Sequence, residues 1–103
     1  MSLLRGTVVR ADIGADTPKP FLVVSNNQRN RALPSALVVR LTTMPKPAVP
    51  SVVECGPADP FVGRILCDDL LEILDEEVTA VLGAVTPGTM HRVEDGLRHA
   101  LAL

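Results

Sequence analysis

The chain has 103 residues, of which 47% are hydrophobic but only 2% aromatic, so Val, Leu, Ile and Ala must fill its core. This length suits one compact domain, residues 1–103, and excludes a deep cleft between two domains. No apolar run approaches the roughly 18 residues of a membrane helix, and no secretory signal pattern opens the chain, which favours a cytoplasmic protein without membrane contact.

The net charge of −2 conceals an uneven distribution of charged residues. Residues 1–46 carry seven basic and two acidic side chains, whereas residues 47–103 carry three basic and ten acidic ones. A chain polarised in this way can present a positive face to an anion despite its negative total. Chance segregation of surface charges would give the same numbers, so charge alone leaves both interpretations open.

The first two-thirds of the chain is predicted to form short strands separated by turns. Glycines, prolines and polar residues punctuate Val-rich and Leu-rich runs whose lengths are typical of strands. Prolines at 45, 47 and 50 exclude a helix there, and residues 26–31 are expected to form a polar hairpin loop. We expect strands over residues 4–11, 21–24, 36–41, 51–55 and 63–68, the last continuing through 70–73.

The C-terminal third changes to a helical period. Residues 75–82 are predicted to form a brief helix. Thr86 followed by Pro87 is a helix start signal, a threonine cap with proline at the first helical position. One face of the helix that follows is apolar and should pack on the sheet; its members are Met90, Val93, Leu97, Ala100 and Leu101. The fold class is therefore mainly β (α+β), a small barrel or sandwich with helices packed on it.

Histidine and cysteine chemistry is not favoured by the pattern. His91 and His99 project away from the apolar helical face and are expected to be solvated rather than catalytic. Cys55 and Cys67 match neither a zinc site nor a redox pair, and are expected to be reduced thiols buried in the protein. We therefore expect no metal site.

Three elements of the basic half are candidates for anion binding. In Pro18-Lys19-Pro20, flanking prolines restrict the backbone of a lysine that could anchor a phosphate, although composition alone favours an idle surface lysine. Thr42 and Thr43 end an apolar strand, so at least one hydroxyl faces outward. The segment 26–31 combines amides with guanidiniums and could contact both bases and phosphates, with a plain polar loop about equally well supported.

These same segments resemble the MazF/PemK family, the toxin halves of bacterial toxin–antitoxin pairs. The resemblance runs over essentially the whole chain, and its strength lies in the order and spacing of four motifs. They are the opening run 5–12 (RGTVVRAD), the element 18–26 (PKPFLVVSN), the strand 38–43 (VVRLTT) and the strand 63–68 (GRILCD).

The resemblance implies an SH3-like β-barrel with a short helix and a C-terminal helix, working as a homodimer. It implies a sequence-selective endoribonuclease that cleaves single-stranded RNA by 2′-OH attack, with no metal or cofactor, and so inhibits translation and growth. A MazE-like antitoxin with a flexible acidic tail would occupy the RNA groove. A topoisomerase-binding toxin like the CcdB proteins and an inactive SH3-like binding module are the alternatives.

Residue by residue, the resemblance implies a site at the strand ends. Lys19 stands where the family commonly has a catalytic arginine, Thr42 at its catalytic Ser/Thr position, and Asp68 at an acidic position that some members use. Lysine is a departure, since it carries a compact charge that can release its proton, whereas arginine offers a planar fork that cannot. RNA contacts are expected from Asn26, Asn27, Arg29, Arg31, Arg40 and Thr43.

Overall fold

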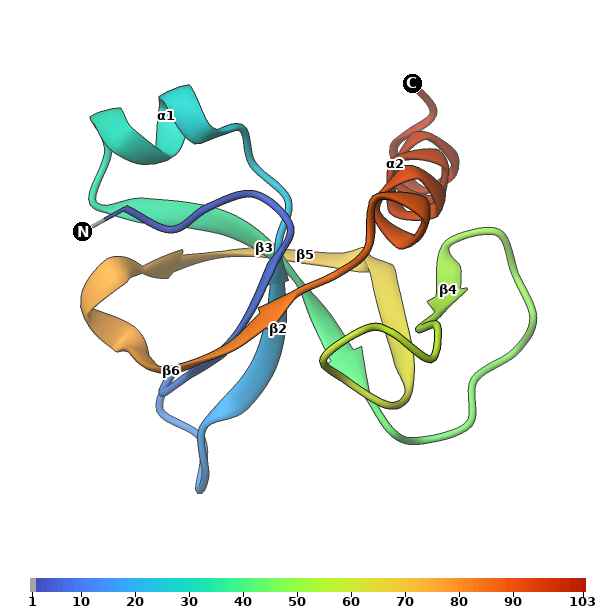
Figure 1. Cartoon of the computed structure of the whole chain (residues 1–103), viewed down its shortest axis with the longest axis horizontal. Coiled ribbons are helices and arrows are strands. Elements are labelled where there is room, and N and C mark those ends of the chain that lie inside the picture. The colour runs from blue at the N-terminus through green and yellow to red at the C-terminus, as the bar shows by residue number, and fades with distance from the viewer. Residues whose placement is uncertain (1) are drawn as a thin grey trace.

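The computed structural model describes residues 2–103 and consists of one antiparallel sheet with two helices (Figure 1). The strand order in the sheet is β4-β5-β3-β2-β1-β6. The elements in chain order are β1 (Thr7–Ala11), β2 (Lys19–Val23), α1 (Asn27–Ala32), β3 (Ser35–Thr42), β4 (Val52–Glu54), β5 (Arg64–Leu74), the 3₁₀ turn η1 (Asp75–Glu77), β6 (Val78–Ala84) and α2 (Pro87–Leu101).

Both faces of the sheet are buried, because alternate residues of the central strands enter two different hydrophobic cores. Val8, Leu22 and Val39 belong to the core that α2 covers, while their neighbours Phe21 and Val38 belong to the second core. Since successive side chains of a strand point to opposite faces, the near-continuous Val/Leu runs require cover on both sides. The 11-residue strand β5 contributes Ile65 to one core and Ile73 to the other. Packing in the two cores therefore determines on which face of the sheet each side chain at a strand end lies.

The mainly β (α+β) fold class predicted from sequence is confirmed, but the sheet is not a closed barrel. Within residues 2–103 the edge strands β4 and β6 are not paired with each other, so the sheet stays open. The five predicted strands are all present with boundaries moved by a few residues, and β5 runs without a break from Arg64 to Leu74. No helix in this part of the chain is long and apolar enough to cross a membrane.

Two local predictions were wrong. Residues 75–82 were expected to be helical, but only Asp75–Glu77 make a 3₁₀ turn, and Val78–Ala84 form strand β6 paired with β1. The three acidic residues resemble a first helical turn, yet the β-branched residues that follow complete the sheet. Residues 26–31 were expected to be a loop, but 27–32 form α1, whose N-cap side chain Asn26 accepts a hydrogen bond from the Arg29 N–H at 2.7 Å.

The C-terminal helix begins as predicted. The Thr86 side chain accepts from the Thr89 N–H and Pro87 opens the helix. Met90 and Val93 are buried in the first core and Leu97 packs against it. The apolar face does not continue to the end of the helix, because Leu101 is 49% exposed and Ala100 is exposed as well.

Candidate nucleic-acid site at the β2–β3 strand ends

An open depression of about 430 Å³ lies where β2 begins and β3 ends. Lys19 and Thr42, two of the three residues expected to be catalytic from the resemblance, both line it. Arg40 and Thr43, expected to contact RNA, line it as well. The remaining lining residues are Arg10, Thr17, Pro18, Pro20, Leu41, Met44 and Phe61.

The register of the β2–β3 pair explains why these side chains meet. Phe21 is paired with Arg40, Leu22 with Val39 and Val23 with Val38. Continuing that antiparallel register by two residues puts Lys19 opposite Thr42. One face of the sheet then carries the side chains of Lys19, Phe21, Arg40 and Thr42. The second core is the buried part of this face. The hairpin geometry thus delivers an ammonium, a guanidinium and a hydroxyl to one surface.

The backbone around Lys19 and Thr42 is held in place. Lys19 is paired with Ala11 of β1, and its flanking prolines fix their own φ angles, so the residue is rigidly mounted although its side chain is partly exposed. The Thr42 hydroxyl oxygen accepts a hydrogen bond from the Met44 N–H at 3.1 Å. A hydroxyl whose oxygen already accepts from the backbone keeps its own proton to donate to an anion.

The depression is electropositive. Of residues 2–103, three cationic side chains line it and no carboxylate does. Within residues 2–103 Lys19 and Arg10 form no ion pair, whereas the Arg40 Nε lies 3.0 Å from Asp69 Oδ2. A concave surface with one sign of charge concentrates polyanions and strengthens their binding at low salt. The positive face expected from the uneven charge distribution therefore exists at this strand end.

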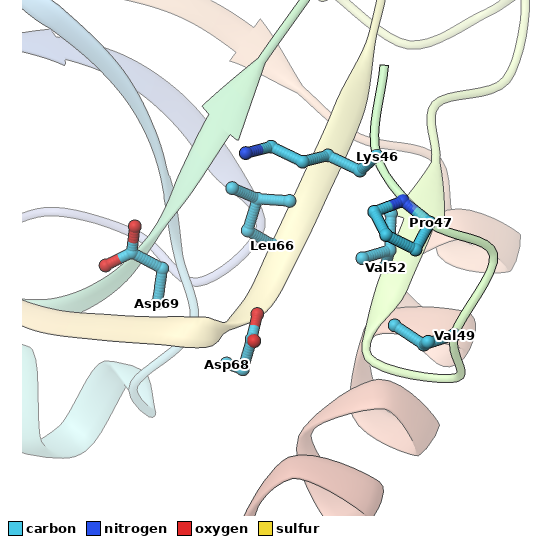
Figure 2. A pocket seen from close by; sticks show the side chains of 7 residues that line it. All are labelled: Lys46, Pro47, Val49, Val52, Leu66, Asp68 and Asp69. Carbon is cyan, nitrogen blue, oxygen red and sulfur yellow. The ribbon is translucent and has the colours of Figure 1, made fainter. Parts of the chain in front are cut away.

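Asp68, expected to take part in the site, does not line the depression that holds Lys19. It lies on β5 in a separate depression, with Lys46 of the β3–β4 loop, Leu66 and Asp69 (Figure 2). The register of the β3–β5 pair shifts between Val39 and Arg40, so residues 67–69 form a β-bulge outside the regular ladder. The carboxylate that reaches Arg40 is Asp69, the neighbour of Leu70, which pairs with Val39.

The polar segment 26–31 lies at the other end of the β2–β3 hairpin, away from Lys19 and Thr42 (Figure 1). Its side chains stabilise the fold. Asn27 accepts from the Arg5 N–H at 2.7 Å, and Asn26 caps the helix. Arg29 donates to the Ser35 carbonyl at 2.9 Å and pairs with Glu72. Arg31 is exposed. The structure therefore does not bring Asn26, Asn27, Arg29 or Arg31 into the depression.

Two residues of this region escaped the sequence interpretation. Arg10 lines the depression because β1 pairs with β2 and places Arg10 next to Pro20. Its position one strand away could have been inferred from the hairpin pattern. Asp69 could not have been distinguished from Asp68 without the register of the β3–β5 pair, which decides which of two adjacent aspartates lies beside Arg40.

A second polar cluster, which the sequence did not reveal, fastens the β4–β5 connection to the start of α2. The Asp59 carboxylate accepts from the Thr89 hydroxyl at 2.6 Å and from the N–H groups of Gly56 and Thr86. Partial burial alone would raise the pKa of Asp59, but these hydrogen bonds, together with the charge of Arg92, lower it. This cluster stabilises the fold and lies outside the electropositive depression.

The cysteines and histidines take no part in the depression. Burial is the main cause that raises the pKa of both thiols, Cys55 and Cys67, to about 11, so neither is a nucleophile near neutral pH. Cys67 is fully buried, as expected, but Cys55 is only partly so. His91 and His99 are exposed on α2, as expected. Among residues 2–103, no three His, Cys, Asp or Glu side chains are grouped as metal ligands would be.

Comparisons with known proteins agree on one family. The model of the PemK-like, MazF-like toxins of type II toxin–antitoxin systems matches residues 4–101. The chain is 42% identical over 100 residues to the endoribonuclease MazF1 of Mycobacterium bovis and to the endoribonuclease MazF4 of Mycobacterium tuberculosis, which covers 97% of this chain and 93% of each relative.

Solved structures give the same result. The structure of a mycobacterial endoribonuclease in complex with its cognate antitoxin superposes with a TM-score of 0.94 at 41% identity, covering 99% of this chain and 97% of that one. A MazE–MazF complex of Deinococcus radiodurans matches with a TM-score of 0.85 at 17% identity, covering 100% and 98%, and supports the fold alone.

Proposed function

Because this chain belongs to the PemK-like, MazF-like toxins of type II toxin–antitoxin systems, we propose that it is an endoribonuclease that cleaves single-stranded RNA at short sequence motifs without a metal ion. The observation that carries the site assignment is the meeting of Lys19, Arg40 and Thr42 on one face of the β2–β3 hairpin in a depression without carboxylates. Cleavage of mRNA, and of structured RNAs with single-stranded loops, would inhibit translation and growth.

The proposed reaction is an intramolecular displacement at phosphorus. The ribose 2′-oxygen forms a bond to the adjacent 3′-phosphorus while the bond from phosphorus to the 5′-oxygen breaks. The products are a 2′,3′-cyclic phosphate and a 5′-OH end. Within the described residues 2–103 no carboxylate or imidazole lines the depression, so the 2′-OH proton passes to water. The protein aligns the attack and stabilises charge on the phosphoryl oxygens.

The candidate residues divide these tasks. The Lys19 ammonium steadies the phosphate and donates a proton to the departing 5′-oxygen. The Thr42 hydroxyl, held by the Met44 N–H, donates to a phosphoryl oxygen. Arg10 and Thr43 bind the strand on either side of the cleaved bond, and Arg40 adds positive charge to the site. Asp68 has no part in this step, since it lies in the other depression.

Sequence selectivity is expected from hydrogen bonds rather than from stacking. The chain contains two phenylalanines and no Trp or Tyr, and of the two phenylalanines only Phe61 lines the depression. Base stacking on aromatic side chains gives affinity without much sequence preference. Polar groups and arginine planes along the groove would therefore read the bases, which favours cutting at defined motifs.

The proposed partners are RNA, an antitoxin and a second copy of the chain, all in the cytoplasm. A MazE-like antitoxin with a flexible acidic tail would compete with RNA for the same cationic depression, since both offer closely spaced anions. A homodimer is expected from the family and would cover some of the large apolar side chains that the single chain exposes; they include Leu4, Met44, Val62 and Val81.

The experiment that tests the function compares two substrates of one sequence. The chain is incubated, with EDTA present, with a single-stranded RNA and with the same strand carrying 2′-deoxyribose at the cut site. We expect cleavage of the first, ending in a cyclic phosphate, and none of the second. Cleavage of the deoxy strand would contradict 2′-OH attack, loss of activity with EDTA would contradict metal independence, and full activity of Lys19→Ala or Thr42→Ala would contradict the site.

A further inference from the structure

Arg40 lines the site and is the one arginine of β3. It precedes Thr42 by two residues, so both side chains leave the strand on the same side. Its strand neighbour Phe21 is fully buried, and the Arg40 side chain covers the end of that core while remaining 40% exposed. The Arg40 side chain is therefore partly packed against the core and partly open to the depression.

The two ends of the Arg40 guanidinium have different surroundings. The Nε is buried and lies 3.0 Å from Asp69 Oδ2, close enough for an ion pair although its N–H is not aimed at an acceptor. Neither Nη group has a hydrogen-bond partner in residues 2–103. The charge of Asp69 therefore holds the guanidinium at its inner end, while the two Nη groups are left to a ligand.

We propose that Arg40 is a second catalytic cation, whose Nη groups bind the non-bridging oxygens of the cleaved phosphate, and that Asp69 is the positioning residue that holds it there. This inference rests on the function proposed above and extends it. A planar guanidinium matches two phosphoryl oxygens at once, whereas an ammonium is a point charge. Arg40 would supply the fork that Lys19 lacks, and Lys19 would be left to protonate the leaving oxygen.

The register of β3 and β5 explains why Asp69, rather than Asp68, meets the guanidinium. Val39 is paired with Leu70, so Asp69 follows beside Arg40, where the bulge of residues 67–69 begins. Successive side chains of a strand point to different sides, and the Asp68 side chain lies apart from that of Asp69 along the depression that both line (Figure 2). Asp68 therefore has the same charge and nearly the same position in the chain, but no contact with Arg40, and it provides a matched control.

The test measures kcat and KM for cleavage of one short RNA by the full-length chain. Arg40→Ala is expected to lower kcat about 10²–10³-fold, the range for removal of one transition-state donor, with little change in KM. Arg40→Lys should restore little of this loss, because it keeps the charge but not the fork. Asp69→Asn should lower kcat up to about fivefold, the equivalent of a partly exposed ion pair, and Asp68→Asn should leave it unchanged.

A double-mutant cycle separates positioning from a merely structural role. If Asp69 acts through Arg40, Asp69→Asn loses its effect on kcat when Arg40 is already alanine. An Asp69→Asn effect that persists in the Arg40→Ala background would overturn the positioning role. Equal thermal midpoints of the variants confirm that each is folded. Full activity of Arg40→Ala alongside inactive Lys19→Ala would overturn this inference alone, whereas a wild-type chain that leaves RNA intact would overturn the proposed function.

Discussion

Helix α2 lies so close to β5 that one added methyl group should destabilise the protein. A Cβ at Gly96 would stand 2.7 Å from Cys67 Sγ, 3.2 Å from Cys67 Cβ and 3.3 Å from the Pro50 carbonyl oxygen. The first distance is shorter than real Cβ contacts, and Cys67 is fully buried, so it cannot move aside freely. Gly96→Ala must therefore push the helix outward or distort the strand.

Two effects of opposite sign decide the magnitude. Alanine is favoured over glycine within a helix by about 1 kcal/mol. Overpacking a well-filled core costs about 1–3 kcal/mol, and contacts with both a side chain and a backbone oxygen place Gly96 in the upper part of that range. We therefore expect a net loss of about 1–2 kcal/mol in the free energy of unfolding, a fall in the thermal midpoint of roughly 4–16 °C for a domain of this size.

Urea and thermal unfolding of Gly96→Ala measure this loss, and a second glycine of the same helix supplies the control. A Cβ at Gly88 would meet only Thr86 Oγ1, at 4.0 Å, so Gly88→Ala should be neutral or slightly stabilising. Adding Cys67→Ala to Gly96→Ala removes the sulfur and should cost less than the sum of the two single changes. A Gly96→Ala protein as stable as wild type would refute the close approach of helix and strand.

Two further predictions concern pH and catalysis. Because the pKa of Asp59 is lowered in the folded chain, its contribution to stability is complete above the unfolded value of about 4 and is lost as the pH falls through the folded value. Asp59→Asn should therefore be less stable than wild type at pH 7, and urea unfolding should show a smaller difference in stability between the two proteins at pH 3. An equal difference at both pH values would contradict the assignment. Lys19→Arg keeps the positive charge but cannot release a proton. If Lys19 is the general acid, kcat for RNA cleavage should fall about 10²-fold or more while KM stays similar. A fully active Lys19→Arg chain would show that Lys19 has a purely electrostatic role.

The family resemblance, rather than local pattern, singled out Lys19 and Thr42. Their common place at one end of the sheet does follow from local pattern, because antiparallel pairing of two apolar runs, one preceded by Lys19 and the other followed by Thr42, brings the two residues together. The helix start at Thr86 was predictable for a similar reason, since a threonine cap followed by proline acts within one turn. In these cases the deciding interactions lie a few residues apart.

What could not be predicted depends on contacts between distant segments. Val78–Ala84 forms a strand because it pairs with β1 at the edge of the sheet. The acidic residues before it are typical of a helix N-terminus, so the local sequence favours a helix instead. The choice between Asp68 and Asp69 depends on the register of the β3–β5 pair, which the residues of β5 alone do not reveal. Asn26 followed by a polar segment was in fact a helix cap, and the helix is fixed by its contacts to Arg5, Ser35 and Glu72.

The presence of lysine at position 19 is easier to understand once Arg40 is considered with it. Phosphodiester cleavage through a charged transition state needs a permanent cation on the phosphoryl oxygens and a proton for the departing oxygen. An arginine at position 19 would meet the first need but not the second, because guanidinium does not give up its proton near neutral pH. Because Arg40 of β3, held by Asp69, supplies the permanent cation, the residue at position 19 does not have to. Lysine, which can give its proton to the departing oxygen, is the residue found there.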